Sequence, residues 1–319
     1  MVDQQNQELE QVFNYLCRNP VSSIDDISSH LNLSNNELTT MIQVLQSMGL
    51  NIEIVGNKAH LITETDIIDS DFIEKQIRKQ GIEKKVDYHF ITESTNLLAQ
   101  NNKQDAIFIS NYQSQGKGRQ AKKWLSPLGQ SIALSLSHRF NNGLQKLSGL
   151  NIAIGVAIAE TLNHFGGQNI GLKWPNDVIG LKGKMAGILI EATGNSKQCR
   201  AIIGIGVNWS IQPELFQSVD QACSNLDLSD VSRTDFITKL ISNIHGFIDE
   251  FNHNGLKKIQ PIWASHDIYM NKYINLLQGS SIQTGKYKGI NNDGLLLVEI
   301  GGELKTFASG EVSIRATTH

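Results

Sequence analysis

Four basic residues and two glycines are concentrated in one nine-residue stretch, GKGRQAKKW, at residues 116–124. Gly116 and Gly118 can adopt backbone conformations closed to other residues and allow a ligand to approach the main chain closely. The basic residues are Lys117, Arg119, Lys122 and Lys123. Together they place positive charge where an anion could be cradled, although the P-loop pattern GxxxxGK[ST] is absent. A solvated basic surface loop is the ordinary alternative, because most charge runs face solvent.

Four further segments carry polar side chains beside apolar runs. They are Ser94-Thr95-Asn96, Gln113, Lys173-Trp174-Pro175-Asn176-Asp177 and Lys184-Met185-Ala186-Gly187. Each has a structural explanation when taken alone: the first as a helix cap, the Asn-Asp pair as an Asx turn, and Lys184 as an exposed strand end. Taken with the cationic loop, they favour a ligand-binding site.

The elements that must position these residues form a central α+β region. Strands are expected in YHFI, AIFISNY, SIALSLS, IGLKW, KMAGILIEA and CRAIIGIGVNW, and helices at about residues 147–165 and 234–251. Several strands follow one another without a crossover helix, which favours a mostly antiparallel sheet over a doubly wound one. A connecting helix is expected within residues 66–85.

The first 65 residues have the pattern of a winged helix-turn-helix. Apolar residues at helical spacing predict a first helix around residues 9–16 and a second that Ser23 can cap. The third helix starts with a capping box, Ser34-Asn35-Asn36-Glu37, and stops at Gly49. The following NIEIVGNKAHLI predicts a hairpin with a Gly56-Asn57 turn.

The end of the chain contains only short strands. From about residue 274 these are YINLLQG, SIQTGKYKGI, GLLLVEI and LKTFASG, a pattern that predicts a small β-barrel. A length of 319 residues is compatible with two or three domains. The expected domains cover residues 1–65, 66–270 and 271–319.

The composition is typical of a soluble globular protein, with 40% hydrophobic and 18% charged residues and a net charge of −3. The longest apolar run, IAIGVAIA, falls far short of the ~18 residues that span a bilayer. The acidic, polar start MVDQQNQELE argues against a signal peptide. Three scattered cysteines, Cys17, Cys199 and Cys223, without a CxxC pair, predict a reducing cytoplasm. The histidines show no metal-ligand spacing, so no structural zinc site is expected.

Taken in order, the motifs resemble those of bacterial biotin protein ligases. These motifs are STN, YQSQGKGRQAKKWLSPLG, KWPND, KMAGILIE, GIGVN and SGEVSIR. With the preceding helical unit, the chain resembles the subgroup of bifunctional ligases and biotin-operon repressors, and the resemblance covers essentially the whole chain. It implies a class II synthetase-like catalytic domain with a mixed or antiparallel sheet and an SH3-like C-terminal barrel.

The resemblance implies an ATP-dependent, AMP-forming ligase. Biotin and ATP would be its substrates, and Mg²⁺ would bind through the ATP phosphates and not through protein side chains alone. The implied catalytic residues are Lys184, Arg119 and Lys117. The implied biotin-binding residues are Ser94, Thr95, Asn96, Gln113, Lys117, Gly118, Arg119 and Lys184. The implied nucleotide-binding residues are Lys122, Trp124, Lys173, Asn176, Asp177 and Asn208, with Glu311 and Arg315 contributed by the C-terminal domain.

The basic loop departs from the family pattern GRGRxGRxW at three positions. Lys117, Ala121 and Lys122 stand where the family has Arg, Gly and Arg. Lysine supplies charge without the bidentate fork of arginine, and alanine adopts a positive φ only at a cost. The resemblance implies that the loop is a lid ordered by ligand, and the departures predict retained activity with altered ligand affinity.

The resemblance also implies that the N-terminal domain binds operator DNA. Through residue 65 the chain has eight acidic and two basic residues, a net charge of −6. The candidate DNA-contacting residues are Asn35, Asn36, Thr39, Thr40, Gln43 and Lys58. Their amides could read base edges, but phosphate neutralisation supplies most of the affinity for DNA. A degenerate or regulatory module is therefore the alternative.

Two other functions stay open. One is a ligand-sensing transcription regulator without ligase turnover. The other is a lipoate- or octanoyl-transferring relative, an alternative that the STN and KWPND motifs disfavour. The resemblance implies a biotin carboxyl carrier protein of acetyl-CoA carboxylase as partner, together with operator DNA and a second copy in a ligand-dependent homodimer. A cytoplasmic location without membrane contact is expected.

Overall fold

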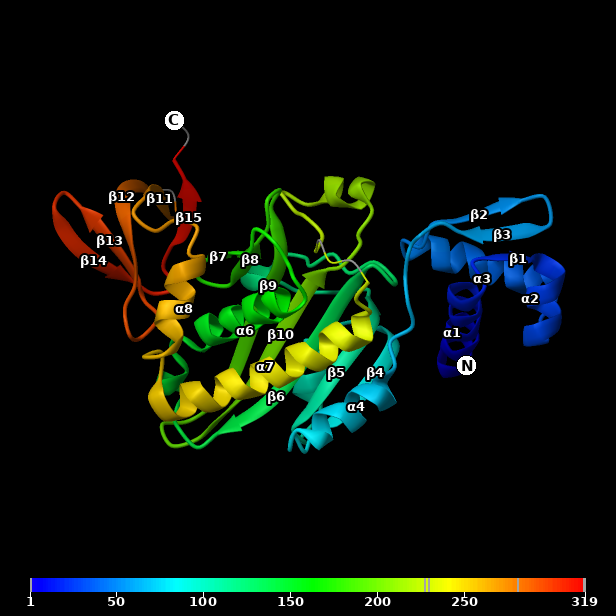
Figure 1. Ribbon diagram of the computed structural model, residues 1–319, viewed down its shortest axis with the longest axis horizontal. Coiled ribbons are helices and arrows are strands. Elements are labelled where there is room, and N and C mark those ends of the chain that lie inside the picture. Colours follow the sequence, from blue (N-terminus) through cyan, green and yellow to red (C-terminus); the bar gives the residue numbers. More distant parts are fainter. Residues whose placement is uncertain (1, 227, 229, 280, 318–319) are drawn as a thin grey trace.

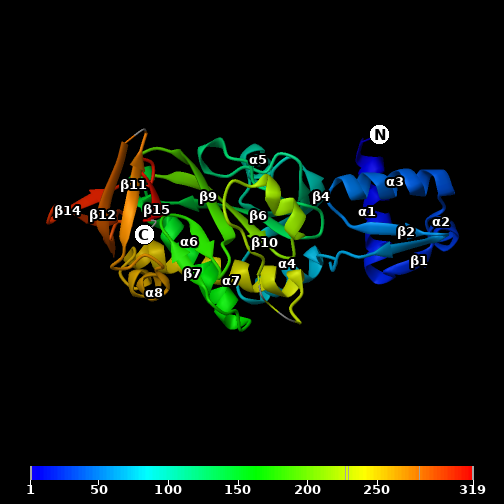
Figure 2. The ribbon, with the colours of Figure 1, turned by 90° about the horizontal axis from the view of Figure 1, so that it is seen from above.

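The computed structural model describes residues 2–226, 228, 230–279 and 281–317. Within these residues the chain forms three β-sheets of three, seven and five strands, which follow one another along the molecule (Figure 1). The seven-stranded sheet lies in the middle, between the small N-terminal unit and the C-terminal strands (Figure 2). Within the described residues, no helix combines the length and the hydrophobicity needed to cross a membrane.

The N-terminal unit has the three helices and the hairpin that the sequence predicts. Ser23 caps the second helix by accepting from Asp26 N, and the Ser34–Glu37 capping box is formed. The sequence pattern missed one short strand, β1, which pairs with β3 and completes a sheet of order β1-β3-β2. The elements are α1 (Val2–Arg18), β1 (Val21–Ser23), α2 (Ile24–Leu31), α3 (Asn35–Ser47), β2 (Ile52–Val55) and β3 (Lys58–Leu61).

This N-terminal unit packs onto the edge of the central sheet. Its apolar core includes Phe90 and Leu128, which belong to the central region. The rings of Phe13 and Phe90 lie 5.4 Å apart, and Leu128 N donates to Met48 O at 3.0 Å. The end of α3 therefore touches the segment that follows the basic loop, a contact that the sequence pattern did not predict.

The central sheet is mostly antiparallel, as predicted. Its strand order is β4-β5-β6-β10-β9-β8-β7, and only the pair β4–β5 is parallel. The short strand β8 was not expected. The strands are β4 (Lys85–Thr92), β5 (Ala106–Gln113), β6 (Ser131–Phe140), β7 (Gly171–Lys173), β8 (Asp177–Ile179), β9 (Lys184–Gly194) and β10 (Cys199–Asn208).

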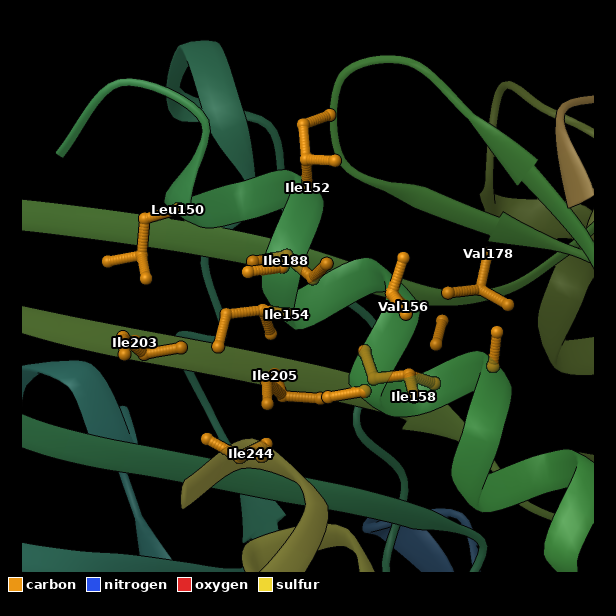
Figure 3. Close-up of a cluster of buried hydrophobic side chains, with 14 of the residues drawn as sticks. Leu150, Ile152, Ile154, Val156, Ile158, Val178, Ile188, Ile203, Ile205 and Ile244 are labelled. Atoms are coloured by element: carbon orange, nitrogen blue, oxygen red, sulfur yellow. The ribbon is translucent and has the colours of Figure 1, made fainter. Parts of the chain in front are cut away.

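Helices cover both faces of this sheet unequally. On one face lie α4 (Ser70–Lys79), α6 (Leu150–His164) and α7 (Arg233–Asn254), and on the other lies the short α5 (Thr95–Asn101) (Figure 2). Nearly all of α6 is buried because it lies between the sheet and α7. Figure 3 shows Ile154 and Ile158 of this helix beside Ile203 and Ile205 of β10. The helix on the α5 face, with seven residues, is the shortest of the four.

The C-terminal strands form an antiparallel sheet of order β14-β13-β12-β11-β15. A hydrogen bond of 3.0 Å from Trp174 Nε1 to Gly294 O ties this sheet to the central one. Another, from Tyr287 Oη to Asp267 Oδ2 at 2.7 Å, fixes it to the segment after α8 (Ile259–His266). The strands are β11 (Tyr273–Gln278), β12 (Ser281–Ile290), β13 (Leu296–Ile300), β14 (Glu303–Phe307) and β15 (Ser313–Ala316).

Candidate active site

A cavity lies on the α5 face of the central sheet, beneath the basic loop. Ten of the residues predicted to bind ligand or act in catalysis line it: Ser94, Thr95, Asn96, Gln113, Lys117, Gly118, Arg119, Trp124, Asn176 and Lys184. They come from the start of α5, the end of β5, the basic loop, the turn before β8 and the start of β9. Its volume is ≈ 50 Å³, room for a few water molecules.

Three glycines of β9 and β10 form the floor of the cavity: Gly187, which belongs to the segment singled out with Lys184, and Gly204 and Gly206, which were not predicted as site residues. A Cβ added at Gly206 would lie 2.2 Å from Trp124 Cε2, and one at Gly204 would lie 2.2 Å from Asn96 Oδ1. A Cβ at Gly187 would lie 2.8 Å from Lys184 Cε. Only glycine allows these three side chains to lie against the sheet. The alternating glycines in GIGVN were the available signal, since glycine in a strand often marks a close approach.

One wall of the cavity is neutral and densely hydrogen-bonded. Thr95 N donates to Gln113 Oε1 at 2.8 Å, and Asn96 Nδ2 donates to Glu191 Oε2 at 2.7 Å. Ser135 Oγ lies 2.7 Å from Thr95 Oγ1 and 2.6 Å from Asn96 Oδ1. Ser135 and Glu191 were not predicted as site residues, because they reach this wall only through strand register.

Helix capping does not explain the Ser94-Thr95-Asn96 triplet. Ser94 occupies the N-cap of α5, but its side chain makes no capping hydrogen bond. All three residues are buried, between 3% and 7% exposed. Buried polar groups are normally hydrogen-bonded, and here Thr95 and Asn96 find their partners on β5, β6 and β9. We call Ser94, Thr95, Asn96 and Gln113 the neutral wall.

The opposite side of the cavity is cationic and centres on Lys184. Its side chain is 13% exposed, and Nζ lies 2.7 Å from Asp177 Oδ1. The ammonium also lies over the Trp124 ring, 5.2 Å from the ring centre, within the range of a cation–π interaction. An exposed strand end is therefore the wrong explanation for Lys184. Its charge is held in one place.

Arg119 connects the loop to two distant segments. Its Nη1 donates to Asn176 Oδ1 at 2.9 Å, and its Nη2 donates to Ser309 O, between β14 and β15. Asn176 in turn donates through Nδ2 to Ile188 O at 2.8 Å and accepts through its main-chain carbonyl from Ile188 N. An Asx turn thus does not account for Asn176, which positions the arginine against β9.

Further cations surround Asp177 outside the cavity lining. Burial lowers the pKa of Lys173 while Asp177 raises it, and nearby Lys184, Arg315 and Lys122 lower it again. Lys122 and Arg315 are exposed. Positive charge is thus concentrated around a single carboxylate. Within the described part of the chain, Asp177 is the acidic neighbour that Lys184, Arg119 and Lys173 share, so these cations remain largely available to an incoming polyanion.

Asn208 and Glu311 do not line the cavity. Asn208 Nδ2 donates to Lys184 O at 2.9 Å and to Ser224 O at 3.2 Å, so the residue holds the start of β9 in place. Glu311 Oε2 accepts from Ala308 N at 2.8 Å and closes the turn before β15. Both act on the backbone near the site.

The basic loop is folded back on itself. Lys117 and Lys123 form a β-bridge, and Trp124 N donates to Gly116 O at 2.8 Å. At its tip Ala121 has φ +56°, as does its neighbour Gln120 at +55°. The left-handed region costs an L-residue roughly 1–2 kcal/mol. The expectation that Ala121 stands at a position better suited to glycine is confirmed.

The candidate DNA-contacting residues lie on α3 and the β2–β3 hairpin. Three of the six are bonded within the unit: Asn35 Nδ2 to Asp25 Oδ1, Thr39 Oγ1 to Asn35 O, and Thr40 Oγ1 to Asn36 O. The side chains of Asn36, Gln43 and Lys58 are exposed. The helix therefore offers DNA fewer free donors than its sequence suggests.

Two family models match the chain. The Biotin/lipoate A/B protein ligase family model matches residues 88–208, which include the neutral wall, the basic loop and Lys184. The model of the biotin protein ligase C-terminal domain matches residues 269–315. The chain belongs to the biotin protein ligase family.

Curated relatives are similar to this biotin protein ligase family member over nearly the whole length of its chain. The bifunctional ligase/repressor BirA of Salmonella typhimurium is 28% identical over 301 residues, 92% of each chain. That of Bacillus subtilis is 25% identical over 299 residues, 90% of this chain and 92% of its own. Among solved structures, a mutant of the Aquifex aeolicus biotin protein ligase in complex with biotin has a TM-score of 0.61 at 25% identity. The match covers 73% of this chain and 99% of that one.

Proposed function

We propose that this protein is a biotin protein ligase, which activates biotin with ATP to biotinyl-5′-AMP and transfers biotin to a lysine of a biotin carboxyl carrier domain. One observation carries the proposal. A single cavity joins the neutral wall to a cationic side formed by Lys184 and the basic loop. That pairing suits a ligand with a neutral hydrogen-bonding ring at one end and a carboxylate at the other, which describes biotin.

In the first step a biotin carboxylate oxygen attacks the α-phosphorus of ATP. A new O–P bond forms, the bond to the β-phosphate oxygen breaks, and pyrophosphate leaves with the electron pair. Two anions must approach each other, so preorganised cations lower the barrier. Lys184 can act in this way because Asp177 and Trp124 hold its ammonium in place. Arg119 and Lys117 would bring further charge as the loop closes.

Mg²⁺ is part of the proposal only as an ion carried by ATP. Among the described residues, no three His, Cys, Asp or Glu side chains gather as a metal site. Asp177, an acidic residue next to the cavity, is already paired with Lys184 at 2.7 Å. The protein side chains thus suit phosphate oxygens better than a bare cation.

In the second step a lysine amine of the acceptor attacks the acyl carbon of biotinyl-5′-AMP. An amide C–N bond forms, the acyl C–O bond breaks, AMP leaves, and the amine loses a proton. The intermediate is a mixed anhydride that water can hydrolyse, so a loop closed over it protects it. The acceptor we propose is the carrier protein of acetyl-CoA carboxylase. Support comes from a Mycobacterium tuberculosis relative named biotin–[acetyl-CoA-carboxylase] ligase, 25% identical over 211 residues.

We also propose three domains, with boundaries at residues 1–65, 66–270 and 271–319. The first would be a winged helix-turn-helix, the second a class II synthetase-like catalytic domain, and the third an SH3-like barrel. Three helices with a three-stranded sheet, a mixed seven-stranded sheet and a five-stranded antiparallel sheet support this assignment.

A second role as a ligand-dependent repressor is proposed for the N-terminal unit. The BirA relatives are named ligase/repressors, and the end of α3 contacts the segment after the basic loop. Gln130 Nε2 donates to Gly49 O at 2.6 Å and Gln130 Oε1 accepts from Gln212 N at 2.9 Å. Movement of the loop on ligand binding can therefore reach α3 through the segment that contains Leu128 and Gln130. Dimerisation through the central sheet would double the DNA contacts.

DNA binding is tested by titrating salt against binding to the biotin-operon promoter region, with and without biotinyl-5′-AMP. A net charge of −6 in residues 1–65 predicts a shallow salt dependence, since the log–log slope is about −0.9 per phosphate neutralised. Binding should also require the intermediate. Tight binding by the unliganded protein with a steep slope would contradict this, and no binding at all would leave a ligase without a repressor function.

The ligase function is tested by incubating pure protein with biotin, ATP, Mg²⁺ and a carrier domain. We expect biotin on the carrier lysine and AMP in equal amounts. Melting shifts with biotin against lipoate separate the two acyl substrates of the wider family, because a ligand bound to the native state raises the melting temperature. A shift with lipoate and none with biotin would overturn the proposal.

A further inference from the structure

We propose that Glu191 fixes the direction of the hydrogen bonds that run from Ser135 through Asn96 behind the neutral wall, and thereby selects the ligand group that the wall accepts. The proposal rests on the proposed ligase function and concerns its biotin end. Glu191 lies in β9 and does not line the cavity itself. It is a positioning residue that acts through Asn96.

The direction starts at the Glu191 carboxylate, which can only accept hydrogen bonds. The Asn96 amide must therefore turn its Nδ2 toward Glu191, at 2.7 Å, and its Oδ1 toward Ser135, at 2.6 Å. Asn96 is 7% exposed. Its Oδ1 rests on Gly204, where an added Cβ would come within 2.2 Å. The amide thus has a fixed orientation.

The next link is the Ser135 hydroxyl, which has one proton. Asn96 Oδ1 can only accept, so the Ser135 proton is used there. Thr95 Oγ1 lies 2.7 Å from Ser135 Oγ and 3.2 Å from Gln113 Oε1. Either oxygen can accept the Thr95 proton. A proton placed on one of them leaves a Thr95 lone pair free to accept from a ligand in the cavity.

The last link fixes Gln113. Thr95 N donates to Gln113 Oε1 at 2.8 Å, so the side-chain oxygen is occupied and Nε2 is left as the donor. Within the described residues Nε2 has no protein acceptor. The wall therefore offers a ligand a hydrogen-bond donor at Gln113 Nε2 and an acceptor at Thr95 Oγ1. We call this arrangement the order of donor and acceptor.

This order defines the chemical class of the ligand. It fits a group with a carbonyl oxygen next to an N–H, such as a cyclic urea, and the ureido ring of biotin has this pattern. A guanidinium analogue of biotin, in which a protonated imino group replaces the ureido oxygen, has only donors and would point one of them at Gln113 Nε2. Buried groups left without a partner produce strong discrimination.

The test replaces Glu191 with glutamine, which has the same size but can both donate and accept. Asn96 can then turn over, and the direction of the chain is lost. The ureido ring lies away from the reacting carboxylate, so binding is lost equally in the ground and transition states. We expect KM for biotin to rise about tenfold or more, as for a lost hydrogen bond to a charged group. Both kcat and KM for ATP should stay within about twofold.

Discrimination is the second readout. The ratio of biotin to guanidinium-analogue binding should fall at least about fivefold in Glu191→Gln, because a wall without a fixed order no longer rejects a donor. Glu191→Asp keeps an acceptor-only group and should keep more of that ratio than Glu191→Gln. Glu303→Gln, an exposed position in β14, is the matched control and should change neither quantity.

A double-mutant cycle with Ser135→Ala shows whether the two residues belong to one chain. If they do, the double variant should raise KM for biotin about as much as the worse single variant, since residues in one network are not additive. Ser135→Ala also serves as an independent test should Glu191→Gln fail to fold. Two outcomes would overturn the inference: an unchanged KM and ratio in folded Glu191→Gln, or multiplicative effects in the double variant. A wild-type protein that binds biotin with the expected discrimination but never forms biotinyl-5′-AMP would instead refute the ligase function alone.

Discussion

Replacing Lys184 with methionine should slow adenylate formation about a hundredfold and leave the fold in place. The ammonium lies 2.7 Å from Asp177 Oδ1, and the side chain is 13% exposed. At an effective dielectric constant of about 20, a unit charge ~4 Å from developing negative charge contributes about 4 kcal/mol. Asp177 cancels part of this, so we expect a loss of about 2–3 kcal/mol, near the value for removing one preorganised donor.

The assay is single-turnover formation of biotinyl-5′-AMP at saturating biotin and ATP. Because the interaction strengthens as charge develops, kcat and kcat/KM should fall together. Methionine fills the same space, and Arg119 and Lys173 remain near Asp177, so the melting temperature should change little. Lys182→Met is the matched control, an exposed lysine two residues earlier, and should retain full activity.

A rate in Lys184→Met that falls less than about tenfold, which corresponds to ~1.4 kcal/mol of barrier, would refute a catalytic role for Lys184. A large loss of activity together with unfolding would equally fail to support a catalytic role. In that case Asp177→Asn distinguishes the two effects, since it keeps the ammonium and removes only its partner. The asparagine variant should retain more activity than Lys184→Met.

Three further substitutions follow from the packing. Gly206→Ala should reduce activity more than about a hundredfold at an unchanged fold. The added Cβ would lie 2.2 Å from Trp124 Cε2, and a misplacement of a catalytic-site group by about 1 Å has an effect of that size. Gly246→Ala, with open space around it, is the control in the same kinetic assay. Ala121→Gly should raise the free energy of unfolding by up to roughly 1 kcal/mol in urea titrations, since it relieves left-handed strain in the folded loop. A lower free energy of unfolding would contradict this. Arg233→Met should lower the free energy of unfolding by about 3 kcal/mol in urea titrations. The fully buried guanidinium would no longer satisfy the Asp66 carboxylate and the Asn111 amide. A change below about 1 kcal/mol would show that these contacts contribute little.

Long periodic segments allowed the sequence to predict most of the fold. The helices α6 and α7 and six of the seven strands of the central sheet lie where the pattern predicts them. The missed elements are short. β1 and β8 have three residues each and α5 has seven, so too few positions repeat for a period to show. Partners elsewhere in the fold, and not local preference, stabilise these elements.

The site residues could be predicted from the sequence only where several of them lie in one short motif. The basic loop, the Ser94-Thr95-Asn96 triplet and Lys184 are local patterns, and they meet at one cavity. Ser135 and Glu191 are ordinary strand residues, and only the pairing of Gly204 with Ser135 and of Ile202 with Glu191 brings them to Asn96. The docking of the N-terminal unit on Phe90 and Leu128 depends in the same way on tertiary contacts that no short pattern encodes.

The most direct test of the central claim is exchange of radiolabelled pyrophosphate into ATP by the pure protein. The first step proposed here is reversible and needs only biotin, ATP and Mg²⁺, so no acceptor protein is required. We predict that label enters ATP when biotin is present and that exchange is absent without it. A folded protein that binds biotin yet catalyses no biotin-dependent exchange would contradict the ligase and leave a ligand-sensing regulator in its place.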